Sequence, residues 1–137
     1  MPTTTEVHAR DRNTIIASVV AGKTYRILAK GQWVDWHIKT DARGFPSPFY
    51  LKPFEHRRRL STANWFALVG FISPVPLTDR GELNPAGSEL LDLSTYVDGV
   101  HTWNCPESGS LHVFANDLPN AYRNNKGFIS VSIHEDN

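Results

Sequence analysis

The sequence is poor in cysteine and in long apolar runs, and it carries no net charge. Cys105 is the only cysteine, so neither an internal disulfide nor a cysteine-based zinc site can form. Lys+Arg and Asp+Glu number 14 each, so overall charge gives no attraction to nucleic acid or to anionic membranes. No apolar run approaches the ~20 residues that a membrane helix needs. These absences favour a globular protein that works in water.

The beginning of the chain is polar. Residues 1–13, MPTTTEVHARDRN, lack the apolar core of a secretory signal peptide. We therefore expect a protein made in the cytoplasm, with release by a non-classical route left open. The length of 137 residues suits one domain, residues 1–137, and the 40% of hydrophobic residues is ordinary for a globular protein.

A period of two dominates the hydrophobic pattern. Two segments show it most clearly, with apolar residues at Tyr25, Ile27 and Ala29 in one and at Ile129, Val131 and Ile133 in the other. Such alternation buries one face of a β-strand and leaves the other in water. The sequence therefore predicts strands over both segments.

Further strands are predicted where short β-branched or aromatic segments end at Gly, Pro or Asn, namely over 14–20, 32–38, 65–72 and 110–116. The continuous apolar run at 65–72 is typical of a central strand covered on both faces. Residues 88–97 fit either one helical turn or a strand. Together these segments predict an all-β fold, a small jelly-roll-like antiparallel β-sandwich.

Two segments rich in Pro and Gly, 44–53 and 73–87, are predicted to be loops. Both exceed the usual loop length of about 4–6 residues. Long loops on a rigid β scaffold often carry binding function.

Several catalytic and binding motifs are absent. AGKT at 21–24 ends like a phosphate-binding loop, but Ala17 stands where the pattern needs Gly, and a strand follows instead of a helix. The six histidines show no H-x-H or H-x-x-x-H spacing for zinc, and no G-x-S-x-G nucleophile motif occurs. We therefore expect no enzymatic activity, although a hydrolase site assembled from distant residues stays a weaker alternative.

Four tryptophans occur, and large aromatic residues in strands usually belong to the core. Trp33 and Trp36 are three positions apart in a predicted strand, an odd spacing that places them on opposite faces. Both therefore cannot point into one core, and Trp36 is the candidate for the exposed side.

The segment NDLPNAYRNNKG at 116–127 offers ligands for a hard cation. Asp117, Asn124 and Asn125 supply one carboxylate and two amide oxygens within nine residues. Calcium takes six to eight such oxygens, including backbone carbonyls that a turn at Pro119 and Gly127 could direct inward. The D-x-[DN]-x-[DN]-G pattern of an EF-hand is absent. With one carboxylate, coordination positions would stay open for water or for the hydroxyls of a sugar.

Composition alone favours a plainer interpretation of the same segment. Asn, Asp, Pro and Gly are also the residues from which polar turns are built. From the residues by themselves, a polar turn is the better hypothesis and a calcium site the alternative.

The order of residues in this segment resembles a known family. NDLPNAYRNNKGFISVSI (116–133) is similar to the C-terminal signature of the PA-IL-like (LecA-like) bacterial lectins, approximately N-D-V-P-G-T-Y-x-N-N-x-G-x-F-S-V-x-I. Upstream, TWNCPESGSLHVFAND (102–117) resembles the W-x-x-P segment that leads into that signature. FALV (66–69) resembles a central strand of the family, and AGKTYRILAKGQW (21–33) resembles its G-D-x-x-x-I-x-A-x-G-W. The similarity thus spans most of the chain.

The resemblance implies a jelly-roll-like lectin that binds galactose through a bridging calcium ion, usually as a homotetramer. It implies calcium ligation by the side chains of Asp117, Asn124 and Asn125 and by the main-chain oxygens of Trp36 and Ala121. Two hydroxyls of the sugar would complete the coordination, and Asp117, Asn124 and Asn125 would also hydrogen-bond them. The implied partners are galactose-containing glycans or glycoconjugates.

The chain departs from the family in the loop that contacts the sugar. The family has a short E-H-P-D-Q-G element whose His and Gln reach the primary hydroxyl of the sugar, whereas this chain has FEHRRRL at 54–60. His56 matches the family's His, so the resemblance also implies a sugar contact there, but no residue matches the Gln. Arg57 to Arg59 could replace it as donors, admit an acidic sugar, or be solvated.

Two functional hypotheses follow. The first is a calcium-dependent carbohydrate-binding lectin in which sugar hydroxyls coordinate the metal. The second is a non-lectin β-sandwich that serves interaction or adhesion, with a structural calcium site or a plain turn at 117–125.

Overall fold

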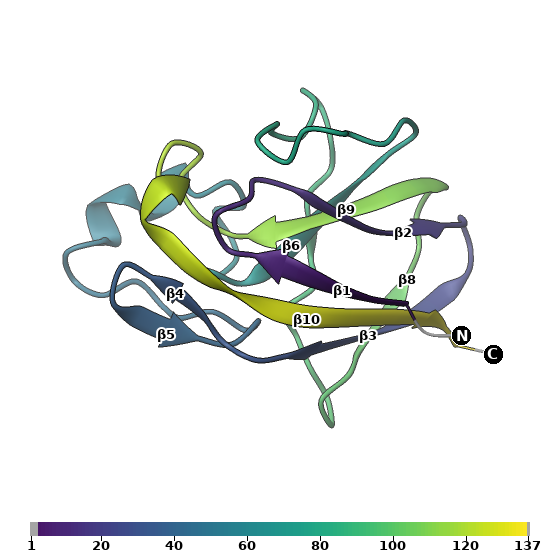
Figure 1. The fold of residues 1–137 in the computed structure, drawn as a ribbon, viewed down its shortest axis with the longest axis horizontal. Helices are drawn as coiled ribbons and strands as arrows, with labels where there is room; N and C mark the ends of the chain where they lie inside the picture. The colour runs from purple at the N-terminus through teal and green to yellow at the C-terminus, as the bar shows by residue number, and fades with distance from the viewer. Residues whose placement is uncertain (1–2, 137) are drawn as a thin grey trace.

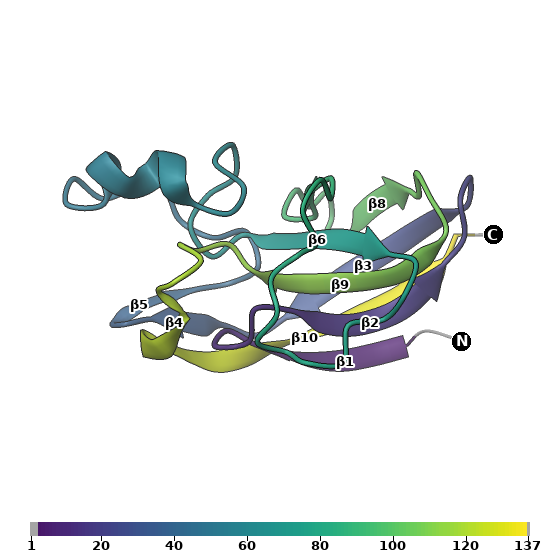
Figure 2. The same ribbon diagram turned by 90° about the horizontal axis from the view of Figure 1, so that it is seen from above.

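A computed structural model describes residues 3–136, and it is built almost entirely of strands in two antiparallel sheets that face each other (Figures 1 and 2). The first sheet contains β1 (Thr3–His8), β3 (Thr24–Lys30), β4 (Trp33–Asp35), β5 (Ile38–Thr40), β8 (His101–Asn104) and β10 (Asn125–Glu135). The second contains β2 (Thr14–Val19), β6 (Leu68–Ser73), β7 (Leu91–Asp92) and β9 (Gly109–Ala115). The predicted antiparallel β-sandwich is confirmed.

The strand order differs from the chain order in both sheets. The first runs β5-β4-β10-β3-β8, with β1 also paired to β10, and the second runs β2-β9-β6-β7. Strand β10 organises the first sheet because it pairs with β4 at its start and with β1 and β3 along the rest. Two short 3-10 helices, η1 (Lys52–Arg57) and η2 (Tyr122–Asn124), lie outside the sheets. Among residues 3–136, no helix is long and apolar enough to cross a membrane.

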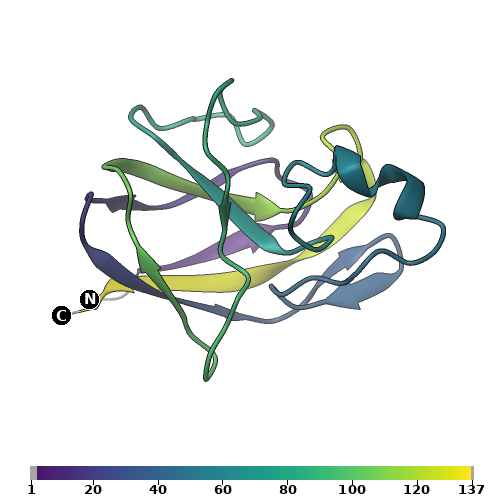
Figure 3. The same cartoon turned by 180° about the vertical axis from the view of Figure 1, so that it is seen from behind.

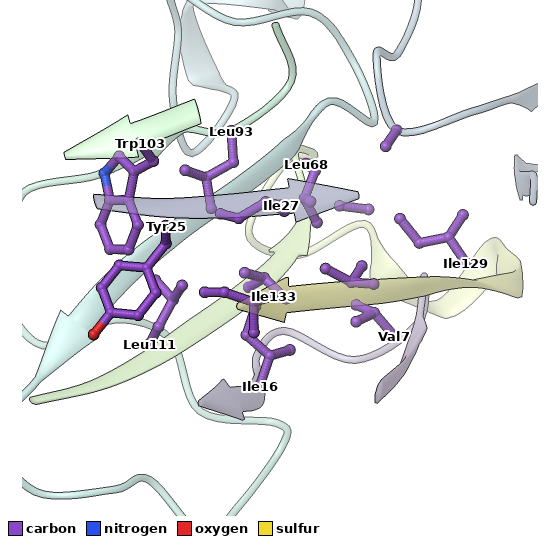
Figure 4. Close-up of a cluster of buried hydrophobic side chains, with 14 of the residues drawn as sticks. Val7, Ile16, Tyr25, Ile27, Leu68, Leu93, Trp103, Leu111, Ile129 and Ile133 are labelled. Atoms are coloured by element: carbon purple, nitrogen blue, oxygen red, sulfur yellow. The ribbon is translucent and has the colours of Figure 1, made fainter. Parts of the chain in front are cut away.

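The core forms between the two sheets from the residues that alternation selected (Figure 4). Tyr25 and Ile27 of β3 are buried there, and so are Ile129 and Ile133 of β10. Val19, Leu68 and Leu111 meet them from the second sheet. The strands predicted from alternation are thus confirmed, together with the face that each one buries.

Strand β6 is buried along its whole length, as the apolar run predicts. Its outward face packs into a second cluster with Phe114, under the partly buried Leu77 of the long loop that follows β6. That loop is attached by a hydrogen bond in which the Leu77 amide donates to Nε2 of His112, at 3.1 Å. The imidazole of His112 stacks on Phe71. Long loops therefore cover the sheet here.

One segment differs from its predicted element, and another settles an open alternative. Residues 32–38, predicted as one strand, form the hairpin of β4 and β5, in which Asp35 pairs with Ile38 around a turn at Trp36 and His37. Residues 88–97 contain only the short strand β7, which decides between the two alternatives in favour of a strand. The turn separates the two tryptophans as alternation predicts: Trp33 is fully buried, whereas 64% of Trp36 is exposed.

The β4–β5 hairpin, η1 and η2 gather at one end of the sandwich, away from the end where β1 begins and β10 finishes (Figures 1 and 3). The segment 116–124 therefore lies beside loops that are distant in sequence. This end carries all the residues that were predicted from the sequence to bind calcium or sugar.

The loop that leads to this end depends on Gly44. A Cβ atom there would lie 2.2 Å from the carbonyl oxygen of Trp65 and 2.6 Å from the amide nitrogen of Ala67, and φ is +75°. Gly22 has a similar φ of +84° but nothing within 4 Å of a Cβ. Alanine substitutions at Gly22 and Gly44 would therefore separate two costs to stability, that of a left-handed backbone and that of a steric clash.

We expect Gly44→Ala to destabilise the fold by about 3 kcal/mol or more, because backbone atoms would have to move. Gly22→Ala should cost only about 1–2 kcal/mol, from the left-handed backbone alone. Urea denaturation of both variants measures the difference. Equal losses of unfolding free energy in the two variants would show that the close approach of backbone atoms to Gly44 does not affect stability.

Candidate functional site

Asp117 is a buried carboxylate at the start of the segment that follows β9. Only 3% of the residue is exposed. The Leu118 amide donates to Oδ1 at 2.7 Å, and Nδ2 of Asn125 donates to Oδ2 at 3.1 Å. Burial and, after it, the nearby Asp35 carboxylate raise the pKa of Asp117 to about 7, against the two hydrogen bonds, which lower it. The protein thus keeps an acidic group in a place that disfavours its charge.

Asn125, the first residue of β10, orients this carboxylate. It is 3% exposed, and its Nδ2 donates to the carbonyl of Ala9 at 3.0 Å as well as to Asp117. A backbone carbonyl can only accept, so the amide nitrogen must face Ala9 and Oδ1 must face the other way. Oδ1 of Asn125 is buried and has no hydrogen-bond partner among residues 3–136. Such an orphaned oxygen is uncommon and has the chemistry of a cation ligand.

Asn116 has a different role from its neighbours in the segment. Its carboxamide is fully buried and holds the loop at 60–64. Nδ2 donates to the carbonyls of Leu60, Ala63 and Asn64 at 2.9, 3.2 and 3.0 Å, and Oδ1 accepts from the Leu60 amide at 2.9 Å. This asparagine therefore anchors the loop.

Trp36 and Asn124 meet at the surface. The Trp36 amide donates to the carbonyl oxygen of Asn124 at 3.3 Å, which joins the β4–β5 turn to the end of η2. Trp36 has a φ of 56°, a left-handed conformation that is uncommon for a bulky residue. Its exposed indole packs edge-on against His37, with the ring centroids 4.1 Å apart.

The structure thus gathers most of the predicted ligands. Asp117 and Asn125 are in direct contact, and Trp36 and Asn124 are hydrogen-bonded. Ala121 caps the start of η2, and its amide donates to the Leu118 carbonyl at 3.0 Å, within the same turn. That these five residues bind calcium stays a prediction.

Asp35 is a site residue that the sequence reasoning missed. It lies directly opposite Asn125 in the pairing of β4 with β10, so the two side chains share one face of the sheet. Burial raises the pKa of Asp35, and His37 lowers it. The signal was available in the sequence, because Asp35 is two positions from Trp33 and so belongs to the buried face of the strand.

The chemistry of the donors fits a hard cation. Among residues 3–136, no group of three or more His, Cys, Asp or Glu side chains is arranged to hold a metal ion. A metal at this end would therefore depend on amide and main-chain oxygens besides the carboxylates. That donor set suits calcium better than zinc or copper.

His56 lies apart from these contacts. It is exposed near the end of η1, and η1 lies at the same end of the sandwich as η2 (Figures 1 and 3). Its matched role as a sugar contact stays a prediction.

The three arginines after His56 have different roles. Arg57 is exposed, whereas Arg58 donates from Nε to the Glu55 carbonyl at 2.9 Å and from Nη2 to the Ser61 carbonyl at 2.7 Å. Arg58 also lies over the ring of Trp65, at 5.3 Å from its centroid. Solvation, one of the three alternatives for this run, therefore describes Arg57 better than Arg58.

Arg59 is built into the structure around the site. Its Nη1 donates to the Arg12 carbonyl at 2.6 Å and to the Tyr122 hydroxyl at 3.0 Å. The guanidinium lies 3.3 Å from the centroid of the Phe114 ring, and burial lowers its pKa. The Arg59 amide donates to the carbonyl of Asp117 at 3.0 Å. The chain after η1 is thereby attached to the segment that carries Asp117.

We expect Arg59→Ala to lower the free energy of unfolding by about 2–3 kcal/mol, because hydrogen bonds and a cation–π contact are lost from a partly buried site. Arg57→Ala removes the same charge from an exposed position and should change stability by less than about 0.5 kcal/mol. Chemical denaturation of the two variants tests this. Similar stabilities of the two variants would contradict the proposal that Arg59 stabilises the fold by attaching the chain after η1 to the segment that carries Asp117.

Comparison with known proteins gives matches of very different extent. No protein-family model matches the chain. The chain is 33% identical over 107 residues to vacuolar protein sorting/targeting protein 10 of Colletotrichum graminicola, a match that covers 78% of this chain. The chain spans only about 7% of the length of that relative.

The structural likeness is more extensive. A solved structure described as "EclA N-terminal domain; PllA-like lectin" superposes with a TM-score of 0.64 and 18% sequence identity, over 98% of this chain and 96% of that one. At such low identity the likeness concerns the fold. The chain therefore has the β-sandwich fold of a solved lectin domain.

Proposed function

We propose that the protein is a calcium-dependent carbohydrate-binding lectin without catalytic activity. The observation that carries this proposal is the contact between two buried side chains, the Asp117 carboxylate and the carboxamide of Asn125, whose Oδ1 has no hydrogen-bond partner among residues 3–136. Burying both is unfavourable unless something compensates them, and a hard cation does so. The lectin fold of the solved neighbour supports the same function.

The proposed ligands are the side chains of Asp117, Asn124 and Asn125 and the main-chain oxygens of Trp36 and Ala121. Five protein oxygens are fewer than the six to eight that calcium takes. Two vicinal hydroxyls of a sugar would complete the shell, so the metal would join protein and ligand.

The proposed sugar is galactose or a galactoside. The exposed indole of Trp36 would pack against the apolar face of the sugar ring, and His56 would reach a peripheral hydroxyl. Open monosaccharide sites of this kind bind weakly, so a homo-oligomer, a tetramer by resemblance, would supply avidity for glycans and glycoconjugates.

The first test removes the loop carboxylate. With wild-type protein on a glycan array in calcium buffer, we expect galactoside signals that excess chelator abolishes. Asp117→Asn should remove calcium binding and glycan binding together, because the buried anionic ligand is lost. Asp98→Asn is the control, since it makes the same change at an exposed position whose φ of 53° asparagine tolerates.

Circular dichroism and thermal melting would establish that the Asp117 variant is folded. Glycan binding that survives chelation would contradict calcium dependence. A blank array with calcium present, together with a calcium-induced rise in melting temperature, would favour a non-lectin interaction module with a structural calcium site.

A second test separates the indole of Trp36 from its main-chain oxygen. Trp36→Ala keeps the main-chain oxygen but loses the aromatic surface, so galactose affinity should fall about fivefold to tenfold. Calcium affinity should stay within about twofold, because the proposed metal ligand is retained. Titration calorimetry with each ligand measures both.

Phe128→Ala removes a partly exposed aromatic ring from the outer side of β10 and should leave both affinities unchanged. An unchanged galactose affinity in Trp36→Ala would contradict a role for the indole in sugar binding.

A further inference from the structure

We propose that Asp35 is a second carboxylate ligand of the calcium site, so that the metal is held by one aspartate from each of two distant segments. The inference rests on the proposed function, because it concerns the same site. It adds a ligand outside the segment 116–127.

The pairing of β4 with β10 places Asp35 at the site. Asp35 and Asn125 are directly opposite in an antiparallel pair, where Cβ atoms are about 4.5–5.5 Å apart and the side chains point the same way. Asn125 in turn contacts the carboxylate of Asp117. Asn125 is therefore a neighbour of both aspartates.

Alternation gives the direction of the Asp35 side chain. Trp33 is fully buried on the inner face of β4, and Asp35, two residues later, belongs to the same face. Asp35 is only partly exposed. Its carboxylate therefore occupies a position on β4 where an apolar, inward-facing side chain would be usual. An acidic group in such a position needs a compensating charge.

No salt bridge among the described residues supplies that charge. None of the ion pairs formed among residues 3–136 includes Asp35 or Asp117. His37 is the titratable neighbour of Asp35, and it occupies an exposed turn. Asp35 and Asp117 thus both neighbour Asn125, whose buried Oδ1 has no hydrogen-bond partner among residues 3–136. A divalent cation satisfies all three groups at once.

The second carboxylate changes how the site would behave. With Asp117 alone, bound calcium keeps a net positive charge, whereas with Asp35 as well the two aspartates balance it. Calcium affinity in oxygen-rich sites rises with the charge of the ligands. The protein should therefore load calcium before it meets a sugar, and the sugar hydroxyls should contribute little to holding the metal.

An alternative without metal is that the two carboxylates share one proton, as closely spaced acids do. In that case Asp35 would stabilise the metal-free fold and would have no effect on calcium affinity. The two accounts therefore predict different effects of Asp35 on calcium affinity, which can be measured.

The experiment is calcium titration by calorimetry into the full chain, freed of metal by chelator, at pH 8 and without sugar. Asp35→Asn keeps the size of the side chain and removes its charge, and we expect calcium affinity to fall about 10–100-fold. Asp98→Asn is again the matched control and should bind calcium like the wild type. At saturating calcium, Asp35→Asn should still bind galactose.

Thermal melting provides a second readout. Without calcium, Asp35→Asn should melt at a higher temperature than the wild type, because a like charge beside Asp117 is gone. With calcium its melting temperature should rise by less than that of the wild type. A purely structural aspartate would give a lower metal-free melting temperature and an unchanged calcium response.

The outcomes separate the two proposals. Wild-type calcium affinity in Asp35→Asn would overturn the role of Asp35 and leave the proposed function standing. A wild-type protein that takes up no calcium would overturn both.

Discussion

A buried carboxamide, that of Asn116, holds together the end of the sandwich that carries the candidate site. Its four hydrogen bonds fix the loop at 60–64 to the end of β9. The backbone repeats the connection, because the Phe66 amide donates to the Asn116 carbonyl at 2.7 Å and the Arg59 amide donates to the Asp117 carbonyl. The loop at 60–64 is thereby fixed next to the segment that carries Asp117. Immobilising Asn116 helps to position Asp117, which also has hydrogen bonds of its own to Leu118, Asn125 and the Arg59 amide.

Strand β10 makes the second essential connection. It begins at Asn125, inside the site, and then continues as the strand that pairs with β1 and β3. Asn125 also reaches the Ala9 carbonyl just after β1. The position of the site therefore follows from the register of the sheet, and a slip of one residue would turn Asn125 away from Asp117.

Sequence alone could predict the sandwich and part of the site. Alternation in β3 and β10 and the apolar run at β6 depend on local periodicity, which a single chain displays. The contact between Asp117 and Asn125 was predictable for a similar reason, because the two are close in sequence and both polar. The hairpin at 35–38 was missed because Trp36 adopts a left-handed conformation that usually belongs to glycine. A tryptophan at position 36 therefore indicates a continuing strand and not a turn.

Asp35 shows what a local pattern cannot provide. Its alternation with Trp33 was visible, but its proximity to Asn125 depends on the pairing of strands that are 90 residues apart in sequence. The different roles of Arg57 and Arg59 could not be predicted from the sequence for the same reason. Nothing in EHRRR distinguishes Arg57, which faces solvent, from Arg59, which lies on Phe114. Both distinctions arise from tertiary contacts.

These contacts also narrow how a sugar could be selected. Arg58 and Arg59 are engaged with backbone carbonyls and aromatic rings, so the run of three arginines does not form a cationic patch for an acidic sugar. The exposed residues at this end include Arg57, His56 and Trp36, together with Phe54 of η1 and Arg123 of η2. The exposed indole of Trp36 beside the proposed metal would favour a ligand with vicinal hydroxyls on one side and an apolar face on the other. A neutral pyranose has both, and this argument for a neutral sugar is independent of any resemblance in the loop.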